Sequence, residues 1–413
     1  MINFERFELE NGLKIIVHQD KSTPLACINI LYNVGARDEN PDQTGFAHLF
    51  EHLMFGGSIN VPNYDEPLQR VGGENNAFTT NDITNYYLTL PADNIETGFW
   101  LESDRMLSLA FSEKSLEVQR NVVIEEFKQR YLNQPYGDVW LLLRPMAYKV
   151  HPYQWDTIGK EISHIENAQM QDVKNFFNKF YCPNNAIMVV AGNIEVEQVK
   201  VLAEKYFAPI PKGPQNNRNL PKEPEQKEAR LLTVERDVPA TAIYKAYHMC
   251  ARLDSEYYTI DLISDILSRG NSSRLHNSLI KEQQLFSDIH AYVMGDFDKG
   301  LFVISGKLSK GVTIEQAETA IEEEILKIKN SLVTDDELTK VKNKIESSHV
   351  FGEVDVLSKA TNLAVSELLG NANLINQEVE KYLAVSNQQI KDAATKLFSA
   401  KNCSTLHYIS KSN

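Results

Sequence analysis

The chain has 413 residues, of which 42% are hydrophobic and 24% charged, and its formal net charge is −14. This length suits two domains, and the composition is that of a globular protein with enough apolar residues to build their cores. The acidic balance excludes nucleic acid as an expected partner and disfavours anionic lipid. No window reaches the roughly 18 apolar residues that a membrane-spanning helix needs.

The N-terminal residues and the cysteines bear on the compartment. Met1 to Glu10 shows no charged segment followed by an apolar one, so we expect a cytoplasmic protein, or a periplasmic one if a signal peptide has been removed. The four cysteines show no C-x-x-C spacing and are far fewer than a disulfide scaffold would use. We therefore expect buried free thiols and no cysteine ligand for a metal.

Taken in chain order, the first predicted elements are the strands of a β-hairpin. Asn11-Gly12 between two alternating segments is a strong hairpin signal. Further along, Gly56-Gly57 ends a predicted helix. The predicted elements of this half are strands at 7–9, 13–17 and 25–34, a helix at 44–55, a strand-like segment at 77–90, and helices at 95–109 and 113–131.

The clearest break in the chain lies at residues 209–228, where five prolines stand among Lys, Glu, Gln and Asn. Such a composition does not pack a core and indicates an interdomain linker. Beyond it the pattern restarts, because residues 240–251 resemble residues 25–36 and an amphipathic helix follows each. We therefore predict an α+β fold of two structurally similar units, each an antiparallel sheet packed with helices. The predicted boundaries are 1–210 for the first unit, 211–228 for the linker and 229–413 for the second unit.

The run His48-Leu49-Phe50-Glu51-His52 carries the strongest functional signal. On a helix, residues four apart lie on one face, so both imidazoles can reach a single zinc ion. Glu51 lies beside that face and can take a proton from a zinc-activated water and pass it to a leaving amine. Two helix histidines with a surface glutamate by chance are the alternative. The many apolar neighbours in this helix indicate burial, and buried histidines are costly unless they are paired or bind a metal.

A catalytic zinc site needs a third protein ligand and keeps one position open. The predicted helix at 113–131 is the best source, because Glu125 and Glu126 lie there inside an apolar run. Glu126 shares a helix face with Val122 and Val123, so we expect it to point inward and to be the third ligand. Glu125 is the second choice, and the alternative for Glu125 is a solvent-facing side chain.

These motifs resemble the pitrilysin family, which includes pitrilysin, insulysin, the mitochondrial processing peptidase and small bacterial two-unit members. The similarity covers nearly the whole chain and is strongest in the first half. It is carried by the run Gly45 to Gly56 around the zinc motif, Gly73 to Thr80, Asp82 to Tyr86, Gln119 to Val123, and His151-Pro152-Tyr153 followed by Gly159.

The resemblance implies roles for particular residues. In the family the third zinc ligand follows the second histidine at a spacing that matches Glu126. The family's Asn-Ala-x-Thr segment pairs with substrate as an added strand, which implies that Asn76, Ala77 and Phe78 contact the peptide backbone. An ordinary strand is the alternative. An acidic residue that is common in the family is replaced here by Gln119, which puts any auxiliary role of that carboxylate in doubt.

The second half departs from the family pattern in one respect. Members that act alone or as homodimers carry an Arg and a Tyr, seven residues apart, that hold the scissile carbonyl. Ile280 and Ser287 stand at these positions here. The resemblance therefore implies a heterodimer in which a homologous subunit supplies the missing Arg/Tyr pair. A homodimer in which Lys281 or Tyr292 compensates is the second choice.

Together, the residues and the resemblance predict a zinc metalloendopeptidase that hydrolyses unfolded peptides inside a dimeric chamber. Zn²⁺ is the expected cofactor, held by His48, His52 and Glu126, with Glu51 as the catalytic base. The alternative function is a non-catalytic scaffold or a peptide-binding subunit of a processing complex. Such relatives usually lose a member of the zinc motif, whereas this chain keeps all three.

Overall fold

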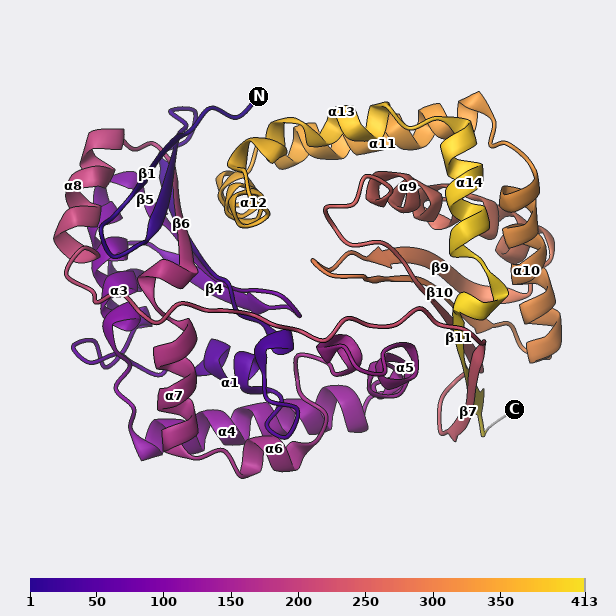
Figure 1. The fold of residues 1–413 in the computed structure, drawn as a ribbon, viewed down its shortest axis with the longest axis horizontal. Helices are drawn as coiled ribbons and strands as arrows, with labels where there is room; N and C mark the ends of the chain where they lie inside the picture. The colour runs from indigo at the N-terminus through magenta and orange to yellow at the C-terminus, as the bar shows by residue number, and fades with distance from the viewer. Residues whose placement is uncertain (412–413) are drawn as a thin grey trace. The chain divides into compact units, whose positions relative to one another are not determined.

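The computed structural model describes residues 1–411, which form two compact units (Figure 1). Each unit is assembled from three segments of the chain. Unit 1 consists of Met1–Gln129, Trp155–Leu220 and Val350–Gln377. Unit 2 consists of Arg130–Gln154, Pro221–His349 and the residues from Glu378 onward. Neither unit is therefore a continuous half of the sequence.

Unit 1 contains a six-stranded sheet in the order β1-β2-β6-β3-β5-β4. Only β2 and β6 run parallel, and all other neighbours are antiparallel. Strand β6 is buried along its whole length and β3 along all but its first residue, as expected of apolar strands covered on both faces. The strands are β1 (Glu5–Glu8), β2 (Lys14–Gln19), β3 (Leu25–Tyr32), β4 (Glu74–Thr79), β5 (Thr84–Pro91) and β6 (Ala186–Gly192).

Helix α12 (Val356–Leu368) comes from late in the chain and packs on β3 and β6 of this first sheet (Figure 1). Ion pairs fasten it at both ends, since Lys359 contacts Asp20, and Glu367 contacts Arg6 at 2.9 Å. The other helices of unit 1 are α1 (Phe46–Leu53), α2 (Asp65–Arg70), α3 (Ile95–Leu107), α4 (Glu113–Phe127), α6 (Ile162–Glu166), α7 (Met170–Phe180) and α8 (Val196–Tyr206).

The sheet of unit 2 repeats five strands of the first sheet in the same arrangement. Its order is β7-β11-β8-β10-β9, with β7 and β11 parallel and the other neighbours antiparallel. Strands β7 to β11 therefore correspond one by one, and in chain order, to β2 to β6. The strands are β7 (Arg230–Arg236), β8 (Ala242–His248), β9 (Phe286–Met294), β10 (Leu301–Leu308) and β11 (Cys403–Ser410).

Helix α5 (Val139–Ala147) belongs to unit 2 and packs on β8 and β11. Its place in the chain order matches that of α12 in the second half, so each sheet is covered by a helix from the other half of the sequence. Further helical segments of unit 2 are α9 (Tyr257–Ser268), a π-helical turn η6 (His276–Glu282), α10 (Ile314–Asn330), most of α11 (Asp335–Gly352), α13 (Glu378–Leu383) and α14 (Asn387–Leu397).

The structure confirms several predicted elements and changes others. The Asn11-Gly12 hairpin is present as β1 and β2, and the two similar α+β units are confirmed. The strand-like segment at 77–90 is two strands, because Thr80 accepts hydrogen bonds from the amides of Asp82 and Ile83 and closes a turn. The linker has neither helix nor strand between α8 and β7.

The predicted domain boundaries differ from the compact units in two segments. A division at 211–228 places residues 130–154 in the first domain and 350–377 in the second, whereas the structure groups them the other way. The reason is packing, because α5 packs on the sheet of the second half of the sequence and α12 packs on the sheet of the first half. Among residues 1–411, no helix is long and apolar enough to cross a membrane. The four cysteines are free thiols, three of them buried and Cys250 partly so.

Candidate metal centre

Helix α1 carries the H-x-x-E-H motif in a fixed position. Five of its eight residues are buried apolar side chains, and the ring of Phe50 stacks on that of Tyr181 with centroids 5.0 Å apart. Gly45 precedes the helix with φ of 89°, and a Cβ there would lie 2.7 Å from the carbonyl oxygen of Ile158. Only glycine fits such a position without strain. The helix can therefore present His48 and His52 on its remaining face.

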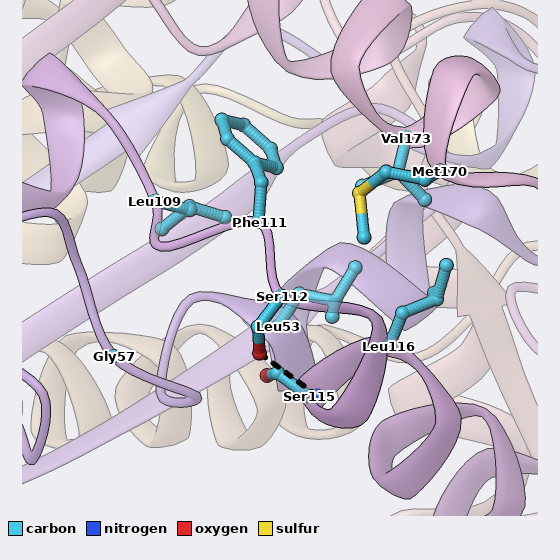
Figure 2. Close-up of a pocket in the computed structure, with 9 residues that line it drawn as sticks. All are labelled: Leu53, Gly57, Leu109, Phe111, Ser112, Ser115, Leu116, Met170 and Val173. Carbon is cyan, nitrogen blue, oxygen red and sulfur yellow. Dashed lines mark hydrogen bonds between the residues drawn. The ribbon is translucent and has the colours of Figure 1, made fainter.

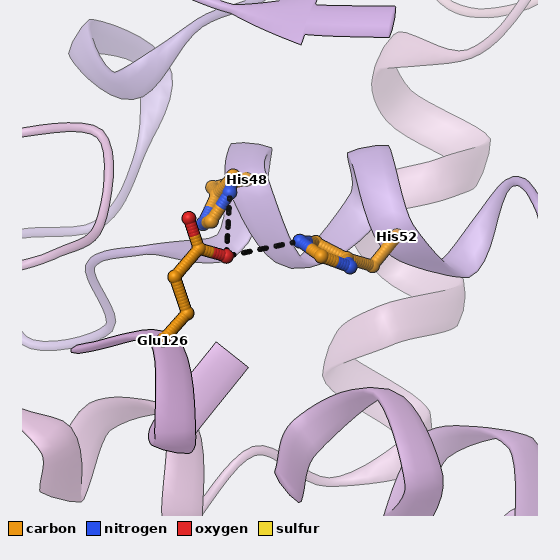
Figure 3. A group of neighbouring side chains, drawn as sticks. All are labelled: His48, His52 and Glu126. Carbon is orange, nitrogen blue, oxygen red and sulfur yellow. Dashed lines mark ion pairs between the residues drawn. The ribbon is translucent and has the colours of Figure 1, made fainter. Parts of the chain in front are cut away.

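Helix α4 brings the third side chain to these imidazoles, as Figure 3 shows. The Oε2 atom of Glu126 lies 3.6 Å from Nε2 of His48 and 3.4 Å from Nε2 of His52. The two imidazole rings stand nearly perpendicular, with centroids 4.9 Å apart. One ligand atom from each of the three residues lies within 4.8 Å of the other two. The three side chains predicted as ligands thus converge on one point.

The spacing of these atoms fits a zinc ion. Zinc binds histidine nitrogen and carboxylate oxygen at about 2.0–2.2 Å, so neighbouring donors of a tetrahedral site are about 3.3–3.6 Å apart. The two measured nitrogen–oxygen distances fall in or close to this range. The side chains of His48, His52 and Glu126 are 13%, 25% and 17% exposed, so each of them is partly accessible to solvent. An open fourth position is what a catalytic zinc site requires and a structural one lacks.

The neighbouring glutamate, Glu125, points elsewhere. Its carboxylate pairs with the ammonium of Lys128 at 2.7 Å, and its side chain is 60% exposed. The structure therefore places Glu126, and not Glu125, beside both imidazoles. Among residues 1–411, these three side chains are the one group of three that could hold a metal ion, and their role as ligands stays a prediction.

Glu51 stands beside this group, and its carboxylate is oriented by a neighbouring strand. The hydroxyl of Thr79 on β4 donates a hydrogen bond of 2.7 Å to Oε2 of Glu51. This leaves the other oxygen, Oε1, available to a water or a substrate. Thr79 was not among the residues predicted for the site. The alternation of strand side chains could have found it, because Thr79 lies two residues after Ala77 and so shares its face of β4.

The predicted peptide-binding residues lie on β4, the edge strand of the first sheet. The strand pairs with β5 on one side and contacts α1. Asn76 is exposed, and its side-chain oxygen accepts a 2.8 Å hydrogen bond from the amide of Ala77. That amide therefore points away from β5, toward the open edge of the sheet. Asn76, Ala77 and Phe78 are thus placed where a further strand could pair, and their contact with substrate stays a prediction.

A small pocket beside α1 is lined mostly by apolar residues and is distinct from the candidate metal centre (Figure 2). Two serines contribute to its wall, and the amide of Ser115 donates to the hydroxyl of Ser112 at 3.1 Å, which caps α4. None of the candidate-site residues His48, Glu51, His52 and Glu126 lines it. The pocket therefore belongs to the packing of α1 against α4 and α7. Its lining is Leu53, Gly57, Leu109, Phe111, Ser112, Ser115, Leu116, Met170 and Val173.

Comparison with known proteins agrees with this fold. Residues 14–153 match the family model described as Insulinase (Peptidase family M16), and residues 167–345 match the model described as Peptidase M16 inactive domain. The chain is 28% identical over 403 residues to a Helicobacter pylori protein named Zinc protease PqqE, covering 94% of this chain and 90% of that protein.

Two further relatives extend the comparison. An Arabidopsis thaliana protein named Probable mitochondrial-processing peptidase subunit beta is 22% identical over 409 residues, covering 93% of this chain and 76% of that protein. The crystal structure of a protease from Helicobacter pylori superposes with a TM-score of 0.93 at 27% identity, covering 99% of this chain and 100% of that one.

A duplicated α+β unit with an H-x-x-E-H helix in its first copy defines the two-unit, pitrilysin-like class of peptidase-family proteins. The chain belongs to the insulinase family, Peptidase family M16.

Proposed function

We propose that this chain is a zinc-dependent endopeptidase whose active centre lies in unit 1. The observation that carries the proposal is the convergence of His48, His52 and Glu126, whose partly exposed side chains place Oε2 of Glu126 at 3.6 and 3.4 Å from the two imidazole nitrogens. A bound zinc ion would supply a Lewis acid that makes water nucleophilic near neutral pH. The relatives named as zinc proteases support the same assignment.

Glu51 performs the proton transfers in this proposal. It follows His48 by three positions and precedes His52, so its carboxylate lies beside the centre without being one of the three donors. It takes a proton from the attacking water and returns it to the leaving amine. The hydrogen bond from Thr79 fixes one carboxylate oxygen, which keeps the other directed at the reaction.

The substrate in this proposal is an extended, unfolded peptide that pairs with β4. Main-chain pairing at a sheet edge gives affinity without strong sequence preference. A bound strand would displace the side chain of Asn76 from the amide of Ala77, after which Asn76 could hydrogen-bond the peptide itself. Because β4 contacts α1, the peptide backbone would pass beside the metal centre.

We further propose that a homologous subunit completes the active site, as a heterodimer that encloses a chamber. Ile280 and Ser287 replace the expected Arg and Tyr. The nearby cation, Lys281, donates to the carbonyl of Asn271 and to Asn277 in its own segment. The relative named as a peptidase subunit beta favours a two-subunit arrangement. A homodimer is the second choice.

The test is cleavage of a quenched fluorescent peptide library by purified, zinc-loaded protein, alone and with a homologous subunit that carries the Arg/Tyr pair. Cleavage only with the partner would support the divided site. Cleavage by this chain alone would support the peptidase and exclude the need for a heterologous partner. Silence in both mixtures, with zinc bound, would favour a non-catalytic scaffold. The observation that favours the scaffold is the match of residues 167–345 to a family model described as an inactive domain.

A further inference from the structure

The N-terminus of α1 has no capping side chain of its own. The first turn of a helix leaves amide groups without helical partners, and a side chain at the N-cap usually accepts from one of them. Here the N-cap residue is Gly45, which has no side chain to offer. The helix that carries the metal-binding motif therefore depends on a residue from elsewhere in the chain.

That residue is Glu39, six positions before the N-cap. Its Oε2 atom accepts a 2.9 Å hydrogen bond from the amide of Gly45, and its Oε1 atom accepts a 2.8 Å bond from the amide of Ala47. The two oxygens of one carboxyl group thus accept from the N-cap amide and from the amide of the second helical residue. His48 is the next residue after Ala47.

Glu39 occupies a site where an acidic side chain is costly. The residue is only 6% exposed, and burial raises the pKa of its carboxyl to about 8 despite the bonds from the two amides. Burying such a group lowers stability unless its polar atoms are satisfied. The two bonds from amides at the start of α1 satisfy this buried acid and indicate a specific task at that helix.

Glu39 ends a short segment, residues 35–39, whose charged side chains hold different parts of unit 1. Arg37 pairs with Asp82 at 2.7 Å, in the turn between β4 and β5. Asp38 receives two bonds from Arg218, at 2.7 and 2.9 Å. One five-residue segment therefore positions both the metal helix and the hairpin that carries β4.

We infer that Glu39 is a positioning residue, which directs the imidazole of His48 at the metal by fixing the first turn of α1. The inference rests on the proposed zinc centre and extends it to a residue that does not touch the ion. Without the two bonds, the first turn would fray, and His48 would sample orientations that do not face Glu126. The consequence is weaker zinc binding, even though every ligand remains.

The experiment measures zinc affinity of the full-length chain by competition with a chromophoric chelator. Removing a partner that orients a metal ligand typically lowers affinity about 10- to 100-fold, which is the result expected for Glu39→Ala. Glu39→Gln keeps the shape and one accepting oxygen, so a smaller loss is expected. The matched control is Glu367→Ala, which removes another buried acid of unit 1 that holds α12 through Arg6. It should lower the melting temperature and leave zinc affinity unchanged.

Equal zinc affinity in wild type, Glu39→Ala and Glu39→Gln would overturn the inference and leave Glu39 a structural residue. A loss of affinity in Glu367→Ala as large as in Glu39→Ala would also overturn it, because the effect would then follow general destabilisation. If Glu39→Ala does not fold, Glu39→Gln decides. Failure of the proposed function is distinct, because a wild-type chain without zinc, or with zinc that persists in His48→Ala, would refute the centre itself.

Discussion

The sheets of units 1 and 2 have the same strand arrangement. The units differ at the helix that follows the second common strand, which is β3 in unit 1 and β8 in unit 2. In unit 1 this helix, α1, places His48 and His52 one turn apart beside Glu126. In unit 2 the helix after β8, α9, also carries two polar residues one turn apart, Asp261 and Asp265. Asp261 accepts from the hydroxyl of Tyr382 at 2.6 Å, and Asp265 pairs with its neighbour Arg269. The polar residues of α9 therefore bind within the unit.

The edge strands of the two sheets, β4 and β9, also differ in how side chains cover their outward-facing backbone groups. The outward amide of Ala77 on β4 is covered only by the side chain of the preceding residue, Asn76. On β9, the amide of Ala291 donates to the hydroxyl of Ser268 at 2.7 Å, and that hydroxyl donates to the carbonyl of Ala291 at 2.9 Å. A side chain from α9 closes the second edge at this position. The two units thus have the same sheet, and a few side chains determine whether its edge strand is accessible to another strand.

The largest expected effect comes from removing α12, the helix that the second half of the sequence contributes to unit 1. A chain that ends at residue 210 lacks α12, which packs on β3 and β6 and is fastened through Lys359 and Glu367. We expect it to lose cooperative unfolding, because apolar strands buried on both faces would be exposed on one. Circular dichroism during heating measures this. A sharp transition in the truncated chain, as in the full-length chain, would contradict the account of unit 1.

The next effect concerns the catalysis that we propose for α1. Glu51→Gln should lower kcat/KM for peptide cleavage by about 10²–10⁴-fold, because general acid–base catalysis contributes that much. Zinc content, measured by inductively coupled plasma mass spectrometry, should stay at the wild-type level. The matched control is Glu125→Gln, whose exposed carboxylate pairs with Lys128, and it should keep full activity. Undiminished cleavage by Glu51→Gln would remove Glu51 from the mechanism.

A smaller effect opens the closed edge of unit 2. Ser268→Ala removes both hydrogen bonds to Ala291 and should destabilise the protein by about 1–2 kcal/mol. Ser264→Ala on the same helix is the control, since its hydroxyl only bonds back to the carbonyl of Asp261 and its loss should matter less. Urea denaturation gives both values. Equal effects of the two substitutions would show that Ser268 has no special part in closing β9.

The smallest expected effect is a pH dependence confined to unit 2. The guanidinium of Arg274, bonded to Glu337, lowers the pKa of that carboxyl to about 2. Since the pKa is depressed in the folded state, the pair stabilises the protein above the unfolded pKa of about 4.3, and this is lost as pH falls toward 2. The Glu337→Gln variant lacks this contribution, so its free energy of unfolding should fall less between neutral and acid pH, by up to about 1 kcal/mol. Identical acid-denaturation curves for variant and wild type would contradict this.

Much of the fold could be predicted from local patterns, but the assembly of the units could not. Asn11-Gly12 specifies its hairpin, because both flanking strands are adjacent in sequence. The apolar face of α12 predicts only that the helix is buried. Nothing local distinguishes the sheet of its own half from that of the other, so the membership of residues 350–377 followed only from the structure.

The candidate site divides in the same way. The four-residue spacing of His48 and His52 and the inward face of Glu126 follow from helix periodicity. Thr79 and Glu39 contact the site from elsewhere in the fold, Thr79 from a strand and Glu39 from six residues before the N-cap of α1. Capping patterns cover the residue before a helix and its first turn, so a cap from a more distant residue leaves no such signature.

The most direct test of the central claim is the zinc content of the purified full-length chain, compared with Glu126→Ala and Glu125→Ala. The two glutamates are adjacent on α4, so the pair controls for helix propensity and charge. We expect one zinc ion per wild-type chain, its loss in Glu126→Ala and its retention in Glu125→Ala. A wild-type chain without zinc, or a Glu126→Ala variant that keeps it, would contradict the assignment of His48, His52 and Glu126 as a zinc centre.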